Sequence, residues 1–249
     1  MSFEVFLRGE LPRWVRVRQQ LDASEVEDVG AAVAAEFLRP HVRVAIRQGT
    51  RVALGVGSRG IDRLAEVVSA AVSEVRRLGG EPFVVPAMGS HGGATADGQL
   101  EVLAQYGVTP DAVGCPIRAG MDTLQLGYVE DGVPVWFDRI AASEADVVIP
   151  INRIKPHTDF HAETESGLLK MIAIGLGKQK GADTFHGRGF DQFERLIPSV
   201  ARRTLQQVTI PFGLALVENG YARLSLIEAV PSDGLVEREK ALLELARER

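Results

Sequence analysis

The sequence predicts an α/β fold, with a mostly parallel sheet, helices on both faces and Rossmann-like topology. Short apolar runs stand at 51–57, 82–87 and 146–151, and such runs are typical of buried strands. Amphipathic segments with helical spacing lie between them. Because strands and helices alternate along the chain, the strands are expected to run parallel, each joined to the next by a helix.

The elements follow from local signals. After the first strand, apolar residues recur at helical spacing from Leu64 to Val75, and Gly79-Gly80 ends this helix. Thr95 is suited to cap a helix over 95–106. The remaining predicted elements are a hairpin over 124–138 turning at 130–132, helices over 167–175 and 190–206, and closing strands over 211–217 and 221–228.

We expect one α/β cofactor-binding domain over 1–249, because 249 residues suffice for a single large domain. The segment 233–249 has the pattern of an amphipathic, charge-rich helix, which is typical of a linker between domains. We therefore expect the natural protein to continue into a second, C-terminal lobe that is absent from this chain.

Composition excludes several classes of protein. The net charge of -5 and the lack of a basic block argue against a nucleic-acid partner. The single cysteine, Cys115, excludes a disulfide framework within one chain and suits a reducing cytoplasm. No apolar run approaches the roughly 20 residues that span a membrane. We therefore expect a cytoplasmic protein with no membrane partner.

Polar side chains stand where three predicted strands end. These positions are Gly57-Ser58-Arg59, Gly89-Ser90-His91 and the long loop from Asn152 to His161. Ligands of open parallel sheets bind beyond the carboxyl ends of the strands. The glycines around His91 would let a ligand approach the backbone closely. We expect a single cleft at this edge of the sheet.

Three motifs leave other interpretations open. His157 and His161 are four residues apart, as in a helical zinc pair, but a proline precedes His157 and no third ligand is close. GVGSRG at 55–60 matches the dinucleotide fingerprint but lacks the acid at the end of the next strand. GLGKQKG at 175–181 could cradle a phosphate. An NAD(P)-dependent oxidoreductase using the 55–60 turn, or a non-catalytic ligand-binding domain, remains an alternative.

The order and spacing of these motifs resemble the nickel-dependent lactate racemase family over about residues 50–190. Arg59 precedes a GSH histidine, His91, by 32 residues, and Lys170 precedes His186 by 16 residues. Both separations are similar to those of the family. PH at 156–157 and SGLLK at 166–170 complete the resemblance.

The resemblance implies an isomerase, a racemase or epimerase, that acts on a small 2-hydroxy acid. Its cofactor would be the nickel-pincer nucleotide, nickel pyridinium-3,5-bisthiocarboxylic acid mononucleotide. His186 would ligate nickel, Lys170 would lie beside or be bonded to the cofactor, and Arg59 would hold the substrate carboxylate. His91 and His157 would act as opposed bases. Further cofactor contacts are expected from the same motifs: Ser58, Ser90, Ser166 and Gly167.

The chemistry suits these residue types. Hydride transfer from C2 avoids a carbanion beside a carboxylate, and histidine exchanges protons near neutral pH. The chain departs from the family pattern at three places. Three extra residues after PH let His161 compete with His157, Val56 stands where the family has an acid, and SGLLK is poorer in glycine. We therefore expect a different hydroxy acid as substrate. The expected partners are separate enzymes that build the cofactor. The sequence is also compatible with a homo-oligomer.

Overall fold

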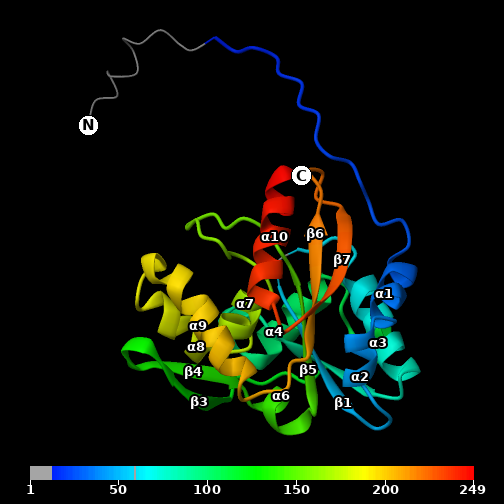
Figure 1. Ribbon diagram of the computed structural model, residues 1–249, viewed down its shortest axis with the longest axis vertical. Helices are drawn as coiled ribbons and strands as arrows, with labels where there is room; N and C mark the ends of the chain where they lie inside the picture. The colour runs from blue at the N-terminus through cyan, green and yellow to red at the C-terminus, as the bar shows by residue number, and fades with distance from the viewer. Residues whose placement is uncertain (1–12, 59) are drawn as a thin grey trace.

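The computed structural model describes residues 13–58 and 60–249. A five-stranded sheet with the order β2-β1-β5-β6-β7 runs through the molecule (Figure 1). The strands of this sheet are β1 (Arg51–Val56), β2 (Glu81–Pro86), β5 (Val147–Arg153), β6 (Phe212–Glu218) and β7 (Leu224–Pro231). Neighbouring strands are parallel except β6 and β7, which pair antiparallel. The predicted fold class, a mostly parallel α/β sheet of Rossmann-like topology, is confirmed.

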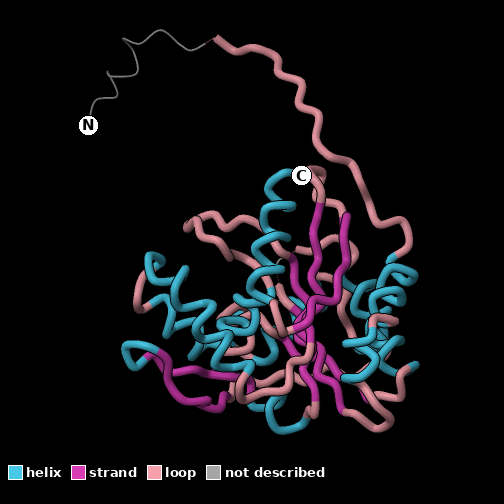
Figure 2. Tube along the Cα trace, viewed as in Figure 1, coloured by secondary structure: helices cyan, strands magenta, loops and turns pink. Residues whose placement is uncertain are grey.

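Helices cover both faces of the sheet, as Figure 2 shows. One face is covered by α1 (Val29–Phe37), α2 (Pro40–Ala45), α3 (Leu64–Arg77), α4 (Ala96–Gln105) and α5 (Pro110–Val113). The other is covered by α6 (Arg139–Glu144), α7 (Leu168–Lys170), α8 (Lys178–His186), α9 (Phe193–Leu205) and α10 (Leu235–Glu248). None of the helices within the described ranges is long and apolar enough to cross a membrane.

The strand sequences explain the two layers. Successive side chains of a strand point to opposite faces of the sheet. In β1, Val52 and Leu54 therefore join the core under α1 and α3, whereas Ala53 joins the core under α8 and α9. Because both faces are buried, the strands are continuously apolar rather than alternating.

A separate two-stranded hairpin extends the second layer. Its strands, β3 (Thr123–Val129) and β4 (Val133–Asp138), pair antiparallel as predicted, and the turn lies at Glu130–Gly132. The inward residues Val133, Val135 and Phe137 belong to the core beneath α8 and α9. The hairpin therefore supports the helices that carry part of the candidate site.

The structure differs from the sequence expectation at GLGKQKG. A loop that could cradle a phosphate was one interpretation of this stretch, but the chain forms helix α8 from Lys178. The glycines allow close backbone packing instead, because a Cβ on Gly177 would come within 2.9 Å of the Gly181 Cα. The predicted helix over 167–175 is also divided, into α7 and a π-helical turn, η4 (Met171–Gly175).

Candidate functional site

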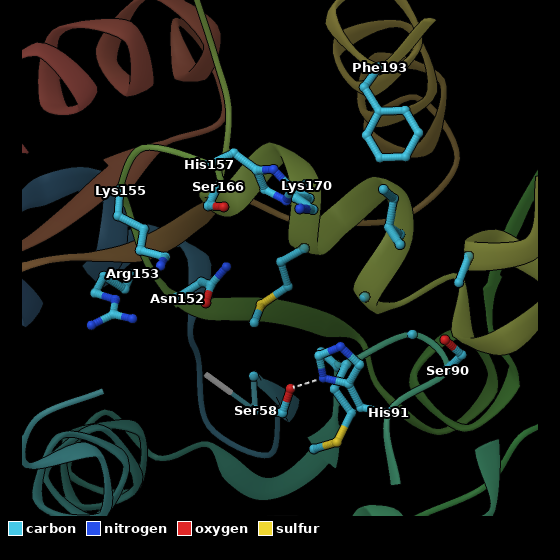
Figure 3. A pocket seen from close by; sticks show the side chains of 18 of the residues that line it. Ser58, Ser90, His91, Asn152, Arg153, Lys155, His157, Ser166, Lys170 and Phe193 are labelled. Carbon is cyan, nitrogen blue, oxygen red and sulfur yellow. Dashed lines mark hydrogen bonds between the residues drawn. The ribbon is translucent and has the colours of Figure 1, made fainter. Parts of the chain in front are cut away.

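A cavity of about 250 Å³ opens beyond the carboxyl ends of β2, β1 and β5. The chain passes from β1 to β2 on one side and later returns to β5 on the other, so the direction of winding reverses at β1. Such reversals leave a crevice at the strand ends. The polar lining comes from these ends, from the loop after β5 and from the α7–α8 segment. Figure 3 labels Ser58, Ser90, His91, Asn152, Arg153, Lys155, His157, Ser166 and Lys170, and Thr158, Asp159 and His186 also line the cavity.

Most of the predicted site residues meet in this cavity although they come from distant parts of the chain. His91, His157, Lys170 and His186 line it, as do the three serines, Ser58, Ser90 and Ser166. In Figure 3, His91 and Ser58 lie on one side of the cavity, and His157 and Lys170 lie on the opposite side.

Two predicted residues lie outside the cavity lining, and a third falls outside the described residues. His161 lies outside the cavity, with a side chain that is 85% exposed and 3.7 Å from Glu165. Gly167 is buried behind the cavity, where its carbonyl accepts a hydrogen bond of 2.8 Å from the Asn152 amide. Arg59, predicted to hold the substrate carboxylate, lies outside the described residues.

His91 is fixed through both its side chain and its backbone. Its Nδ1 is hydrogen-bonded to the Ser58 hydroxyl, at the end of β1. The buried Gln99 amide donates to the carbonyls of Gly89, at 2.9 Å, and of His91, at 3.4 Å. Gly89 has a φ of 61°, a left-handed conformation that favours glycine and turns the chain after β2.

The backbone of His157 is held by the carboxylate of Glu165. The buried carboxylate of Glu165 accepts hydrogen bonds from the backbone N–H of His157 and, at 3.1 Å, of Ala162. Burial tends to raise the pKa of Glu165, but these two donors and Arg247 together hold that pKa below its ordinary value. The loop 157–165 is therefore folded around an ionised carboxylate.

The His157 ring receives a hydrogen bond of 3.1 Å at Nδ1 from the backbone N–H of Asp159. A neutral imidazole that accepts at Nδ1 carries its proton on Nε2. The ring also packs against Phe160, with 4.4 Å between ring centres. His157 is thus oriented as a donor at Nε2.

Lys170 and His186 lie near aromatic side chains. The Lys170 Nζ is 5.6 Å from the centre of the Phe160 ring. The His186 ring lies edge-on to Phe190, with centres 5.7 Å apart, and 5.8 Å from Phe193. His186 ends α8 and is exposed at the cavity mouth, so its imidazole is accessible to a ligand.

The donor set fits a metal that arrives on an organic cofactor. No group of three or more His, Cys, Asp or Glu side chains in the described part of the chain could hold a metal ion. A metal at His186 would therefore take its other ligands from a bound molecule. The nickel-pincer nucleotide implied by the resemblance is a cofactor of this kind, and His186 would be the residue that holds its nickel.

Two cationic residues of the cavity belong to no motif in the sequence. Arg153 ends β5, and Lys155 follows two residues later in the loop. Both belong to a polar stretch at the end of the strand, but the charge density of this stretch also fits a solvated loop. Only the position of the segment beside β1 shows that these side chains face the cavity.

The fold and the site together define an α/β domain with a ligand cavity at the switch point of its sheet. The chain is structurally similar to the lactate racemase apoprotein from Thermoanaerobacterium thermosaccharolyticum, with a TM-score of 0.63 and 13% sequence identity. The likeness covers 88% of this chain and 55% of that chain, and it establishes a shared fold. No protein-family model matches the sequence. A comparison with curated proteins found no match either.

Proposed function

We propose that this chain is the cofactor-binding domain of a nickel-pincer-dependent isomerase, which racemises or epimerises a small 2-hydroxy acid. The observation that carries the proposal is convergence: His91, His157, Lys170 and His186 line one cavity although 95 residues separate the first from the last. The fold shared with a lactate racemase apoprotein supports the same class of reaction.

The residues of the cavity suggest how the cofactor is held. His186 would ligate nickel, Lys170 would lie against the cofactor ring, and Ser58, Ser90 and Ser166 would contact its polar groups. Gly167 would act from behind the cavity, through the start of α7. When bound, the cofactor supplies the hydride acceptor that amino-acid side chains lack.

The proton chemistry would belong to the two histidines. Inversion at C2 requires the hydroxyl proton to leave on one side and a proton to return on the other. If Nδ1–H of His91 donates to Ser58, its Nε2 can accept a proton. His157 holds its proton on Nε2, because its Nδ1 accepts from Asp159. His91 can thus begin as the base, while the Nε2–H of His157 would donate a hydrogen bond to the reacting oxygen. The proton that returns would come from the imidazolium formed when a histidine has taken up the hydroxyl proton.

The substrate would be held by its carboxylate. Arg59 follows Ser58 directly in the sequence and would hold the carboxylate of the hydroxy acid. His161 is no longer needed as a second base, because His157 already lines the cavity. Separate enzymes would build the cofactor and are the expected partners.

Co-expression with cofactor-building enzymes tests the proposal. Native mass spectrometry should find the chain with the cofactor and one nickel, and His186→Ala should lose nickel while keeping the fold. His161→Ala is the matched control, because this exposed histidine lies outside the cavity. Loaded protein should interconvert the stereoisomers of a 2-hydroxy acid. Full nickel occupancy in His186→Ala would refute the ligand assignment, and tight NADH binding would favour the oxidoreductase alternative.

A further inference from the structure

The cavity has two chemically different sides. Phe193 and the exposed His186 belong to one side, where an aromatic ring can pack. Arg153 and Lys155 lie on the other, and Figure 3 shows both of them across the cavity from Phe193. The second side is cationic and comes from the end of β5 and the loop that follows it.

The fold holds the Arg153 side chain and the backbone of Lys155. The Arg153 guanidinium is ion-paired with Glu218 at the end of β6, and its side chain is only 15% exposed. The Glu218 carboxylate is itself anchored by a 2.8 Å hydrogen bond from the Asp62 backbone. Lys155 exchanges two backbone hydrogen bonds with Ser166, of 3.0 and 3.3 Å. Neither side chain is carried by an open surface loop.

The charge of the cavity is opposite to that of the chain. Among the described lining residues, Arg153, Lys155 and Lys170 are cationic and Asp159 is the one carboxylate. The chain as a whole has a net charge of -5. A cleft lined by one sign of charge concentrates ligands of the opposite sign. Arginine and lysine can donate to a ligand oxyanion as well as to a protein carboxylate, because each carries several N–H donors.

We propose that Arg153 and Lys155 form an anion subsite for a phosphate or carboxylate group, separate from the residues assigned to nickel and proton transfer. The existence of the subsite stands on the charges and contacts above. Its natural ligand rests on the proposed function. The oxyanion would be either the phosphate of the nucleotide cofactor or a second acidic group on the hydroxy acid.

Inorganic phosphate and malonate are suitable probes for the cofactor-free chain. Amide NMR shifts at 152–155 should saturate in each titration. Lys155→Gln should weaken binding about tenfold or more, as expected when a charged hydrogen-bond donor is lost. Lys155→Arg should largely restore it. Arg195→Gln is the control, because Arg195 pairs with Glu130 and Asp131 on the hairpin and does not line the cavity.

The amide spectrum of each variant also shows whether it remains folded, and Arg153→Gln supplies a second test at the same subsite. Unchanged affinity in both Lys155→Gln and Arg153→Gln would overturn the proposal, as would shift changes confined to other regions. These readouts require neither nickel nor turnover, so a failure of the proposed function would leave them intact.

A second titration identifies the source of the anion, using protein loaded with cofactor. If loading abolishes phosphate binding, the subsite belongs to the nucleotide phosphate. If loaded protein still binds phosphate and malonate, the subsite serves the substrate, and a hydroxy dicarboxylic acid should be turned over in preference to lactate. Either result supports an anion subsite. Absence of saturable binding in the cofactor-free chain would contradict it.

Discussion

At the scale of single residues, the candidate site depends on which ring nitrogen of each histidine carries the proton. His91 and His157 are bonded at Nδ1 by different kinds of partner, a hydroxyl and a backbone N–H. The N–H of Asp159 can only donate, whereas the Ser58 hydroxyl can donate or accept. Ser58 therefore allows His91 to hold its proton on Nδ1, which leaves Nε2 available as a base.

Replacement of Ser58 by alanine tests this assignment. We expect the neutral His91 ring to change from a single dominant tautomer to a mixture, because the group that orients Nδ1 is gone. Nitrogen-15 NMR of the imidazoles reads the tautomer directly, and the exposed His161 serves as an internal control. In loaded protein we expect kcat to fall by about ten- to a hundredfold. Unchanged nitrogen shifts at His91 would contradict the assignment.

The residues of the site differ in how far they could be predicted. His91 could be predicted because it follows a strand directly and stands among glycines. Glu165 could not, because a carboxylate in a polar loop is ordinarily solvated, and only folding shows it accepting from His157 and Ala162. His161 is the opposite case, a residue that the sequence favours and the structure excludes from the cavity. Its spacing from His157 equals that of two ligands on one helix, but 154–165 is not helical.

At the scale of elements, a buried ion pair joins the strands and helices behind the cavity. Lys178, at the start of α8, is fully buried and lies 2.9 Å from the Asp138 carboxylate at the end of β4. Its Nζ also donates to the Pro86 carbonyl, at 2.5 Å, and to Gln99, at 3.2 Å. Burial lowers the pKa of Lys178, while Asp138 opposes the shift. Lys178, which stands in the GLGKQKG stretch, thus holds the His91 loop against α8.

Replacement of Lys178 by methionine should destabilise the fold by about 3–5 kcal/mol, because Asp138 would be left buried without its cation. Adding Asp138→Asn should recover part of this loss. Lys180→Met is the matched control, because Lys180 is exposed on the same helix, with its Nζ 4.8 Å from the centre of the Trp136 ring. This substitution should lower the free energy of unfolding by at most about 1 kcal/mol. Urea unfolding measures all four proteins. Equal effects at 178 and 180 would refute the structural role of the pair.

The start of α7 shows a second link between elements. Gly167 faces the buried carboxylate of Glu239 from α10, and a Cβ there would lie 2.5 Å from that group. We expect Gly167→Ala to cost about 1–3 kcal/mol through overpacking. Gly181→Ala in α8 should be neutral or stabilising, because its Cβ would meet only ordinary contacts, the nearest at 3.5 Å. Thermal unfolding compares the two variants, and equal midpoints would contradict this account.

At the scale of the whole molecule, the sheet was predictable because its strands are buried on both faces. The runs at 51–57 and 82–87 became β1 and β2 with boundaries shifted by about one residue. The order of the strands could not be predicted from the sequence, because it depends on long-range pairing such as that of Val52 with Val147. Helix α8 was also missed, because glycines that permit close packing and glycines that bind phosphate look alike in a sequence.

Glu239 gives the whole molecule a dependence on pH. The carboxyl group is fully buried between α10 and α7, where the Leu169 backbone N–H donates to it at 3.0 Å. Burial raises its pKa from 4.5 to about 7, against the opposing effect of the backbone hydrogen bonds. Below pH 4.5 the group is protonated in both the folded and the unfolded chain. Between pH 4.5 and 7 only the unfolded chain ionises, so stability falls as pH rises, and above pH 7 the loss is complete.

Glutamine at position 239 removes this titration while keeping the side-chain shape and one acceptor. The free energy of unfolding of Glu239→Gln relative to the wild type should therefore rise between pH 5 and pH 8, by on the order of 3 kcal/mol. Urea unfolding at the two pH values measures the difference. Glu237→Gln is the control, because Glu237 is exposed on the same helix and pairs with Lys240. Stability curves that stay parallel for Glu239→Gln and the wild type would show that the carboxyl group ionises in the folded chain as readily as in water.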